Sequence, residues 1–125
     1  MPDPDLPNLD ESVLDELLAT TEDDRAFVEE LVHTYLSDTP ALVEAVESAA
    51  AADDVAALVR PAHTIKSSSA TVGAARLSAL ARELELAARS GSLDASARDG
   101  LEQVRAEWTA ASDALQAWLT REQRT

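Results

Sequence analysis

Apolar residues recur at helical spacing along almost the whole chain, and this periodicity limits the possible folds more than any other feature. No stretch of four or more residues alternates in the manner of a strand, and only three glycines interrupt the pattern. Helices are therefore predicted over residues 9–18, 22–37, 39–50, 53–72, 74–89 and 94–121. Because short connections favour antiparallel neighbours, the sequence predicts an all-α, antiparallel up-and-down helical bundle.

The predicted helix ends carry recognisable capping residues. Asn8 is expected to cap the first helix, with Glu11 at the capping-box position. Thr39 and Pro40 resemble an N-cap followed by a proline in the first helical position, so a new helix is expected there. Gly91 suits a left-handed residue just past the end of the fifth helix.

The stripes that face inward define the expected core. Trp108 is expected inside it, Trp118 partly exposed at one end of the bundle, and His33 on the surface. The other predicted core residues are Phe27, Val28, Leu31, Val32, Tyr35, Leu36, Leu42, Val43, Val46, Ala50, Val55, Leu58, Val59, Ala62, Ile65, Ser69, Val72, Leu77, Leu80, Leu84, Ala87, Leu101, Val104, Ala111, Leu115 and Leu119.

Composition and charge restrict the class of protein. Residues 1–62 hold 16 of the 24 acidic residues and only two basic ones, which accounts for the whole net charge of −14. A nucleic-acid partner is not expected, because phosphate backbones require a basic surface. The chain has no cysteine, no apolar run that could span a membrane and no signal peptide, so we expect a cytoplasmic protein without a membrane partner. Residues 1–8 are expected to form a mobile acidic tail, and residues 9–125 one domain.

One face of the helix predicted over residues 53–72 carries the most distinctive chemistry. Residues three and four apart share a face, which groups Arg60, His63, Lys66 and Ser67, with Ala70 one turn further. Imidazole can act as a covalent nucleophile when it is neutral, and nearby cations favour that neutral form. The same cations would stabilise a phosphoryl group on the ring, and small neighbours would leave room for a second protein.

A plainer interpretation stands beside this one. A lone helical histidine is more often a surface or satisfied core residue, and Lys66 alone would be an ordinary exposed lysine. Spacing alone favours that interpretation. Arg82 and Glu85 are likewise expected to form an ordinary charged surface. Pro61 is expected to kink the helix without functional meaning; the alternatives are a helix that restarts there, or a kink that pushes His63 outward.

The segment AHTIKSSSATVGAARLSALARELE, residues 62–85, resembles the signature of histidine-containing phosphotransfer (HPt) domains. The matching positions are Ala62, His63, Ile65, Lys66, Ser67, Ser68, Ser69, Val72, Gly73, Ala74, Leu77, Leu84 and Glu85. The resemblance implies a four-helix bundle with one or two extra N-terminal helices. It also implies that His63 is the phosphoacceptor and that Lys66 steadies the phosphoryl group. Ser67 stands where many members have glycine, and this substitution is expected to tune access rather than block it.

For function, the resemblance implies a phosphorelay intermediate. His63 would accept a phosphoryl group from a receiver-domain aspartate and pass it to another receiver, with Arg60, Ser67 and Ala70 at the docking surface. The partners would be receiver domains of response regulators or hybrid histidine kinases. No cofactor is expected on this chain, because the divalent metal belongs to the receiver. The chain has neither a glycine-rich loop nor a P-loop, so it is not expected to be an enzyme with its own ATP-dependent kinase activity.

Three alternatives stay open at this point. The chain could be the phosphoacceptor domain of a larger hybrid sensor kinase, a binding-only helical adaptor for receiver domains, or an unrelated acidic structural bundle. A monomer is expected. The identity of the donor and the acceptor, and the direction of net phosphate flow, do not follow from the sequence.

Overall fold

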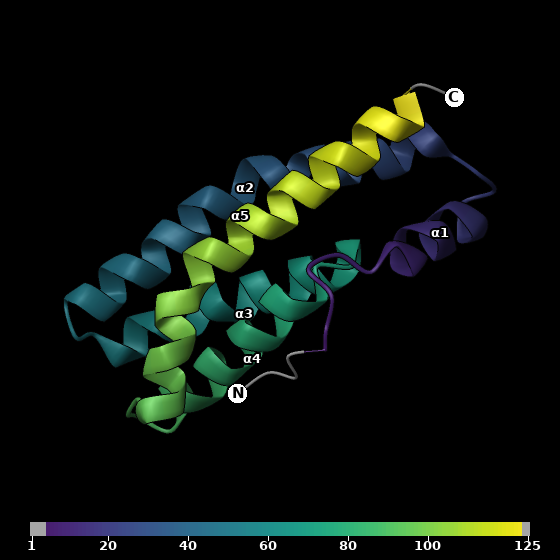
Figure 1. Cartoon of the computed structure of the whole chain (residues 1–125). Coiled ribbons are helices and arrows are strands. Elements are labelled where there is room, and N and C mark those ends of the chain that lie inside the picture. The colour runs from purple at the N-terminus through teal and green to yellow at the C-terminus, as the bar shows by residue number, and fades with distance from the viewer. Residues whose placement is uncertain (1–4, 124–125) are drawn as a thin grey trace.

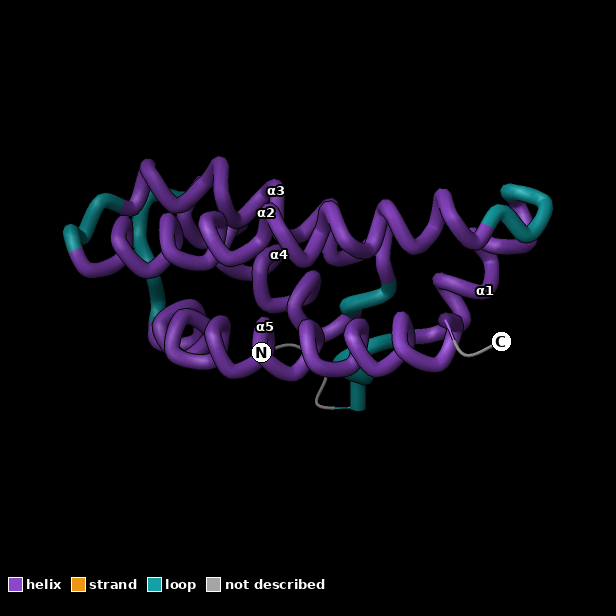
Figure 2. Tube along the Cα trace, turned by 90° about the horizontal axis from the view of Figure 1, so that it is seen from above, coloured by secondary structure: helices purple, strands orange, loops and turns teal. Residues whose placement is uncertain are grey.

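Five α-helices make up the computed structural model, which describes residues 5–123 (Figure 1). They are α1 (Glu11–Thr20), α2 (Arg25–Ala51), α3 (Val55–Val72), α4 (Ala75–Arg89) and α5 (Ala95–Gln123). Helices α2 to α5 form the bundle, and α1 is one additional N-terminal helix; no strand occurs in the described range (Figure 2). The predicted all-α four-helix bundle is therefore confirmed. None of these helices is both long enough and apolar enough to cross a membrane within that range.

The predicted acidic tail lies partly outside the described residues, which begin at residue 5. The backbone N–H of Arg76 donates to the carbonyl oxygen of Pro7, 3.2 Å away. The following helix begins later than predicted, because Asp10 rather than Asn8 is its N-cap. The Asp10 carboxylate accepts a hydrogen bond from the backbone N–H of Ser12.

The break predicted at residues 37–39 is wrong, because α2 continues through Thr39 and Pro40 as one helix of 27 residues. Proline in a helix interior costs about 3 kcal/mol, since its ring removes one backbone hydrogen bond. That cost is outweighed by burial along a single stripe, at about 1.5–3 kcal/mol for each large apolar side chain. Thr39 is itself buried in this stripe, and its hydroxyl donates to the carbonyl oxygen of Tyr35 at 2.6 Å.

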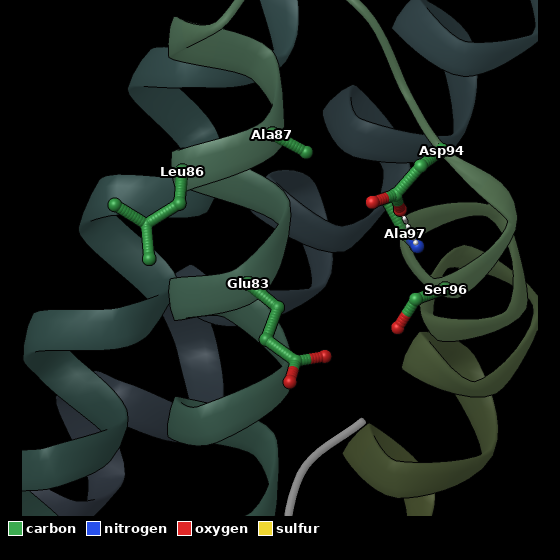
Figure 3. Close-up of a pocket in the computed structure, with 6 residues that line it drawn as sticks. All are labelled: Glu83, Leu86, Ala87, Asp94, Ser96 and Ala97. Atoms are coloured by element: carbon green, nitrogen blue, oxygen red, sulfur yellow. Dashed lines mark hydrogen bonds between the residues drawn. The ribbon is translucent and has the colours of Figure 1, made fainter.

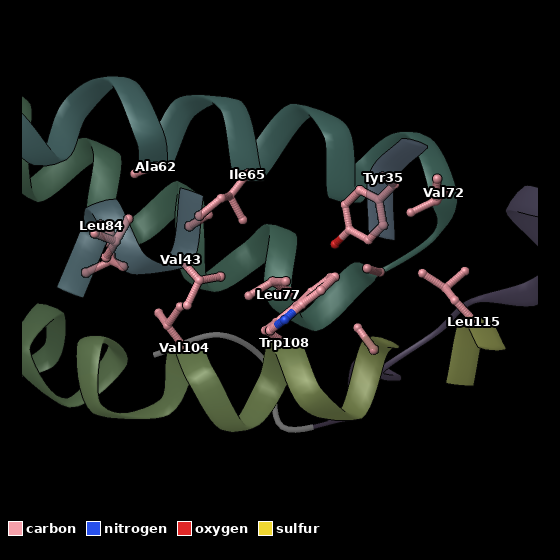
Figure 4. Close-up of a cluster of buried hydrophobic side chains, with 14 of the residues drawn as sticks. Tyr35, Val43, Ala62, Ile65, Val72, Leu77, Leu84, Val104, Trp108 and Leu115 are labelled. Carbon is pink, nitrogen blue, oxygen red and sulfur yellow. The ribbon is translucent and has the colours of Figure 1, made fainter. Parts of the chain in front are cut away.

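The core fills the space between the four long helices (Figure 4). Tyr35 meets Trp108 edge to face at a centroid distance of 5.6 Å, and its hydroxyl bonds to the buried Ser69 hydroxyl at 2.7 Å. Burial raises the pKa of Tyr35 to about 12, so this phenol remains protonated at neutral pH. Ser69, predicted on the inner stripe, is therefore a satisfied polar group of the core.

Two predictions about large apolar residues are wrong. Phe27 is 48% exposed, because Val28 takes the inward direction in the first turn of α2 and Phe27 points about 100° away from it. Trp118 is only 2% exposed, because the end of the bundle is covered. Helix α1 lies over that end, with Leu14 fully buried and Glu11 paired with Arg121 of α5 at 2.8 Å.

The turn between α3 and α4 brings the two helices of the candidate site together. Gly73 adopts a left-handed conformation with φ of +87° and ends α3. Its carbonyl oxygen accepts a 2.7 Å hydrogen bond from the backbone N–H of Asp10. A Cβ at position 73 would lie 2.5 Å from the Asp10 carbonyl oxygen, so glycine is required for both the conformation and the close approach.

Helix α3 continues through Pro61, so the alternative in which a helix restarts at this residue is wrong. The helix begins after Asp54, whose carboxylate accepts a hydrogen bond from the backbone N–H of Ala57. Gly91, just past α4, has a φ of +91°, which confirms its predicted left-handed conformation.

Candidate functional site

His63 lies in the middle of α3 with a side chain that is 52% exposed. Its neighbours Ala62 and Ile65 are buried and hold this turn of the helix against the core. The imidazole is therefore fixed by a packed backbone while its ring faces outward. Lys66 follows one turn later with a partly exposed side chain, so the structure places both residues on the same side of α3, as predicted.

A buried carboxylate of α4 lies beneath these two side chains. Glu85 is only 4% exposed, and its carboxylate contacts three basic groups. Its Oε2 atom lies 2.9 Å from His63 Nδ1, and its Oε1 atom lies 2.6 Å from Lys66 Nζ. Arg89, one turn along α4, donates to Oε2 from Nε at 3.0 Å and from Nη2 at 2.8 Å. The prediction of an ordinary charged surface at Glu85 is therefore wrong.

The position of Glu85 follows from the inward stripe of α4. Residues 77, 81, 84 and 88 are buried on this helix, and position 85 falls on the same side at helical spacing. An acidic residue at an inward position, four residues before an arginine, is the sequence signal that could have identified it. A buried carboxylate requires partners, and here the partners are the imidazole, the ammonium and the guanidinium of the site.

The hydrogen bonds to Glu85 determine its protonation. Lys66 and Arg89, followed by His63, lower the pKa of Glu85 to about 2 despite its burial. The carboxylate is therefore ionised at neutral pH and can only accept hydrogen bonds. His63 Nδ1 must then carry a proton. In the neutral ring this leaves the lone pair on Nε2, the nitrogen not used in the contact with Glu85.

The other predicted site residues occupy the exposed side of α3. Arg60, Ser67 and Ala70 are all exposed, and none of them has a hydrogen bond to His63 or Glu85. Ala70 lines two hollows that also include Val13 of α1. One, of about 310 Å³, extends to Ser78 and Arg82 of α4, and the other, of about 530 Å³, lies between α3 and α1. Neither hollow includes His63, so both lie further along α3, beside Ala70.

A cross-helix bond supports the backbone at Lys66. The hydroxyl of Ser78 on α4 donates to the Lys66 carbonyl oxygen at 2.8 Å. Together with the Glu85 contacts, this bond ties α3 to α4 at the level of the candidate site. The site is thus assembled by two consecutive helices that pack along each other.

Another hollow, of about 340 Å³, lies between α4 and the start of α5 (Figure 3). Its lining includes Glu83, the exposed Leu86 and Asp94, whose carboxylate accepts a hydrogen bond from the backbone N–H of Ala97. It contains none of the residues predicted for the site. His33, on α2, is exposed as expected. Across residues 5–123, no three His, Asp or Glu side chains are grouped so that they could hold a metal ion.

Comparisons with known proteins identify the family of the chain. The family model described as Hpt domain matches residues 30–118. The crystal structure of histidine-containing phosphotransfer protein B (HptB) from Pseudomonas aeruginosa PAO1 is similar, with a TM-score of 0.79 and 30% sequence identity. The similarity covers 92% of this chain and 96% of that one. A search of curated proteins found no match. Because the family model spans well over half of the sequence and includes α3 and α4, the chain belongs to the Hpt domain family.

Proposed function

We propose that this protein is a phosphorelay intermediate that carries a phosphoryl group on Nε2 of His63. The observation that carries the proposal is the contact between His63 Nδ1 and the buried, ionised Glu85. Because Glu85 is ionised, this contact favours the proton on Nδ1 and leaves the lone pair on Nε2 of a side chain that is 52% exposed. Family membership and the similarity to a histidine-containing phosphotransfer protein support a role in histidine phosphotransfer.

In the proposed reaction, Nε2 attacks the phosphorus of a phosphoaspartate on a receiver domain. The N–P bond forms as the bond between phosphorus and the aspartate oxygen breaks, and the leaving carboxylate takes the electron pair. No proton has to leave Nε2, because the proton of the ring is on Nδ1. The phosphorylated ring carries positive charge, which the adjacent Glu85 carboxylate stabilises. Onward transfer to a second receiver reverses these steps.

The surroundings of His63 suit the approach of another protein. Ser67 and Ala70 are small, and Ala70 opens onto the hollows beside α1. Lys66 and Arg89 share the single negative charge of Glu85, and Arg60 lies one turn before His63, so these groups together carry a net positive charge on a chain whose net charge is −14. This positive charge favours binding of the acidic phosphorylation site of a receiver domain. In this proposal the divalent metal is held by the receiver, and Lys66 stabilises the phosphoryl group on His63.

The experiment is a labelling assay with a phosphorylated receiver domain. The wild-type protein should acquire label, and His63→Gln should abolish it. His33→Gln is the matched control, because it removes the other histidine from an exposed position on α2 and should leave labelling unchanged. Label that persists in His63→Gln, or that disappears in His33→Gln alone, would remove His63 from the mechanism. A wild-type protein that binds receivers without acquiring label would instead be a binding-only adaptor.

A further inference from the structure

The two oxygens of Glu85 are held by different partners. Oε1 accepts the Lys66 ammonium at 2.6 Å, whereas Oε2 accepts both His63 Nδ1 and two N–H groups of Arg89. Each of the two cations therefore has its own oxygen. Loss of the Lys66 contact would leave every contact to Oε2 in place.

This division matters because Lys66 has two possible acceptors: the Glu85 carboxylate and a phosphoryl group on His63. In the unphosphorylated protein its ammonium is bound to Glu85. A phosphoryl group on His63 Nε2 would bring a second anion to a position one helical turn from Lys66. A lysine side chain is flexible and only partly buried here, so it can move from one acceptor to the other. The buried Glu85 charge then needs another cation.

We propose that Arg89 is a positioning residue that holds Glu85 against His63 Nδ1 while Lys66 leaves Glu85 for the phosphoryl group. This inference rests on the function proposed above and adds a role for a residue outside the α3 segment. The guanidinium is a rigid fork, and two of its N–H groups already engage the oxygen that His63 contacts. Arg89 and Glu85 are four residues apart on one helix, so their contact does not depend on any movement of α3.

The arrangement has a chemical consequence for both halves of the transfer. With Arg89 in place, Glu85 stays ionised and keeps accepting the Nδ1 proton after phosphorylation. The ring therefore stays in one orientation, and Nε2 remains the only nitrogen available for the phosphoryl group. Without Arg89, departure of Lys66 would leave a buried carboxylate with only the imidazole as its partner, which is costly.

The test measures the His63 tautomer by ¹⁵N NMR in the unphosphorylated full chain at neutral pH, so it does not depend on phosphotransfer. Lys66→Ala imitates the departure of the ammonium, and Glu85→Met supplies the reference for a ring without an acceptor. Lys66→Ala alone should keep the Nδ1–H form. In the double variant Lys66→Ala, Arg89→Gln the His63 tautomer should shift toward that of Glu85→Met. Arg89→Lys combined with Lys66→Ala should restore the Nδ1–H form in part. Arg105→Gln is the matched control, because Arg105 is similarly exposed and pairs with Glu47 away from the site.

Two results would overturn the inference. One is Lys66→Ala alone behaving like Glu85→Met, which would mean that Arg89 cannot hold Glu85. The other is the double variant behaving like wild type, which would mean that Arg89 is not needed.

The movement of Lys66 is followed separately, after chemical phosphorylation of the protein with phosphoramidate. The Lys66 Nζ signal should change in the wild type, whereas an unchanged signal on phosphorylated protein would refute the exchange of acceptors. Failure of receiver labelling alone would contradict the proposed function and leave the tautomer result intact.

Discussion

Replacing Glu85 with glutamine tests the electrostatic role of the buried carboxylate. The substitution preserves the shape of the side chain but removes its negative charge, so Lys66 and Arg89 lose their shared anion. Sequence and packing elsewhere are untouched. The expected result is a protein that folds into the same bundle with a lower free energy of unfolding at neutral pH, and with a weaker dependence of that free energy on acid.

The magnitude follows from the pKa of Glu85. Its value falls from the ordinary 4.5 to about 2 in the folded protein, with Lys66 as the largest cause. A difference of one pKa unit corresponds to about 1.4 kcal/mol, which gives an upper limit of about 3 kcal/mol. Because Lys66 and Arg89 are partly open to solvent, screening reduces the expected contribution to about 1–2 kcal/mol. This stabilisation is complete above pH 4.5 and is lost as the pH falls toward 2.

The assay is urea unfolding followed by circular dichroism at pH 7, 4.5 and 3. The free energy of unfolding should be higher for the wild type than for Glu85→Gln, and this difference should be largest at pH 7. At pH 3 the difference should be about half as large. Glu47→Gln is the control, because Glu47 pairs with Arg105 on the surface and its pKa is also lowered, chiefly by that hydrogen bond. The control should show a smaller difference. A Glu85→Gln difference that is the same at every pH would refute the assigned ionisation.

Two further predictions concern the site and the turn beside it. Lys66→Ala should slow receiver-dependent phosphotransfer by about tenfold or more, measured by labelling kinetics, because a cation at the phosphoryl group is lost; an unchanged rate with an unchanged helical circular dichroism signal would argue against its role. Gly73→Ala should cost at least about 1–2 kcal/mol in urea unfolding, because it combines a left-handed φ with a collision against Asp10. Gly91→Ala shares the positive φ but has open space around the new Cβ, so an equal cost at both positions would show that the collision is unimportant.

Helical periodicity predicted most of the fold because each long helix buries a continuous apolar stripe. The prediction from periodicity was wrong where residues typical of a helix start lie within a continuous apolar stripe. Thr39 and Pro40 have the composition of a helix start, yet the stripe through Tyr35 and Val43 is continuous and α2 continues through them. Trp118 looked partly exposed because the extent to which α1 covers the end of the bundle is a tertiary property that periodicity does not contain.

The sequence predicted which site residues share a face of one helix, but not the contacts between the two helices of the candidate site. The placement of His63 and Lys66 on one side of α3 follows from spacing within a single helix. The partners of Glu85 depend on how α4 is rotated against α3, which local spacing on either helix does not determine. The predicted inward stripe of α4 ran through Leu84 and Ala87 and did not include Glu85, whereas the structure also buries Ala81 and Ala88, four residues before and three residues after it.

The cross-helix contacts have a consequence for how the active geometry is assembled during folding. His63, Lys66, Glu85 and Arg89 all come from one helical hairpin closed by the tight turn at Gly73. Contacts between residues so near in the chain cost little loop-closure entropy, and local topology favours fast formation. The contacts of the candidate site can therefore form within this hairpin, whereas the contact between Glu11 and Arg121 closes a much longer loop.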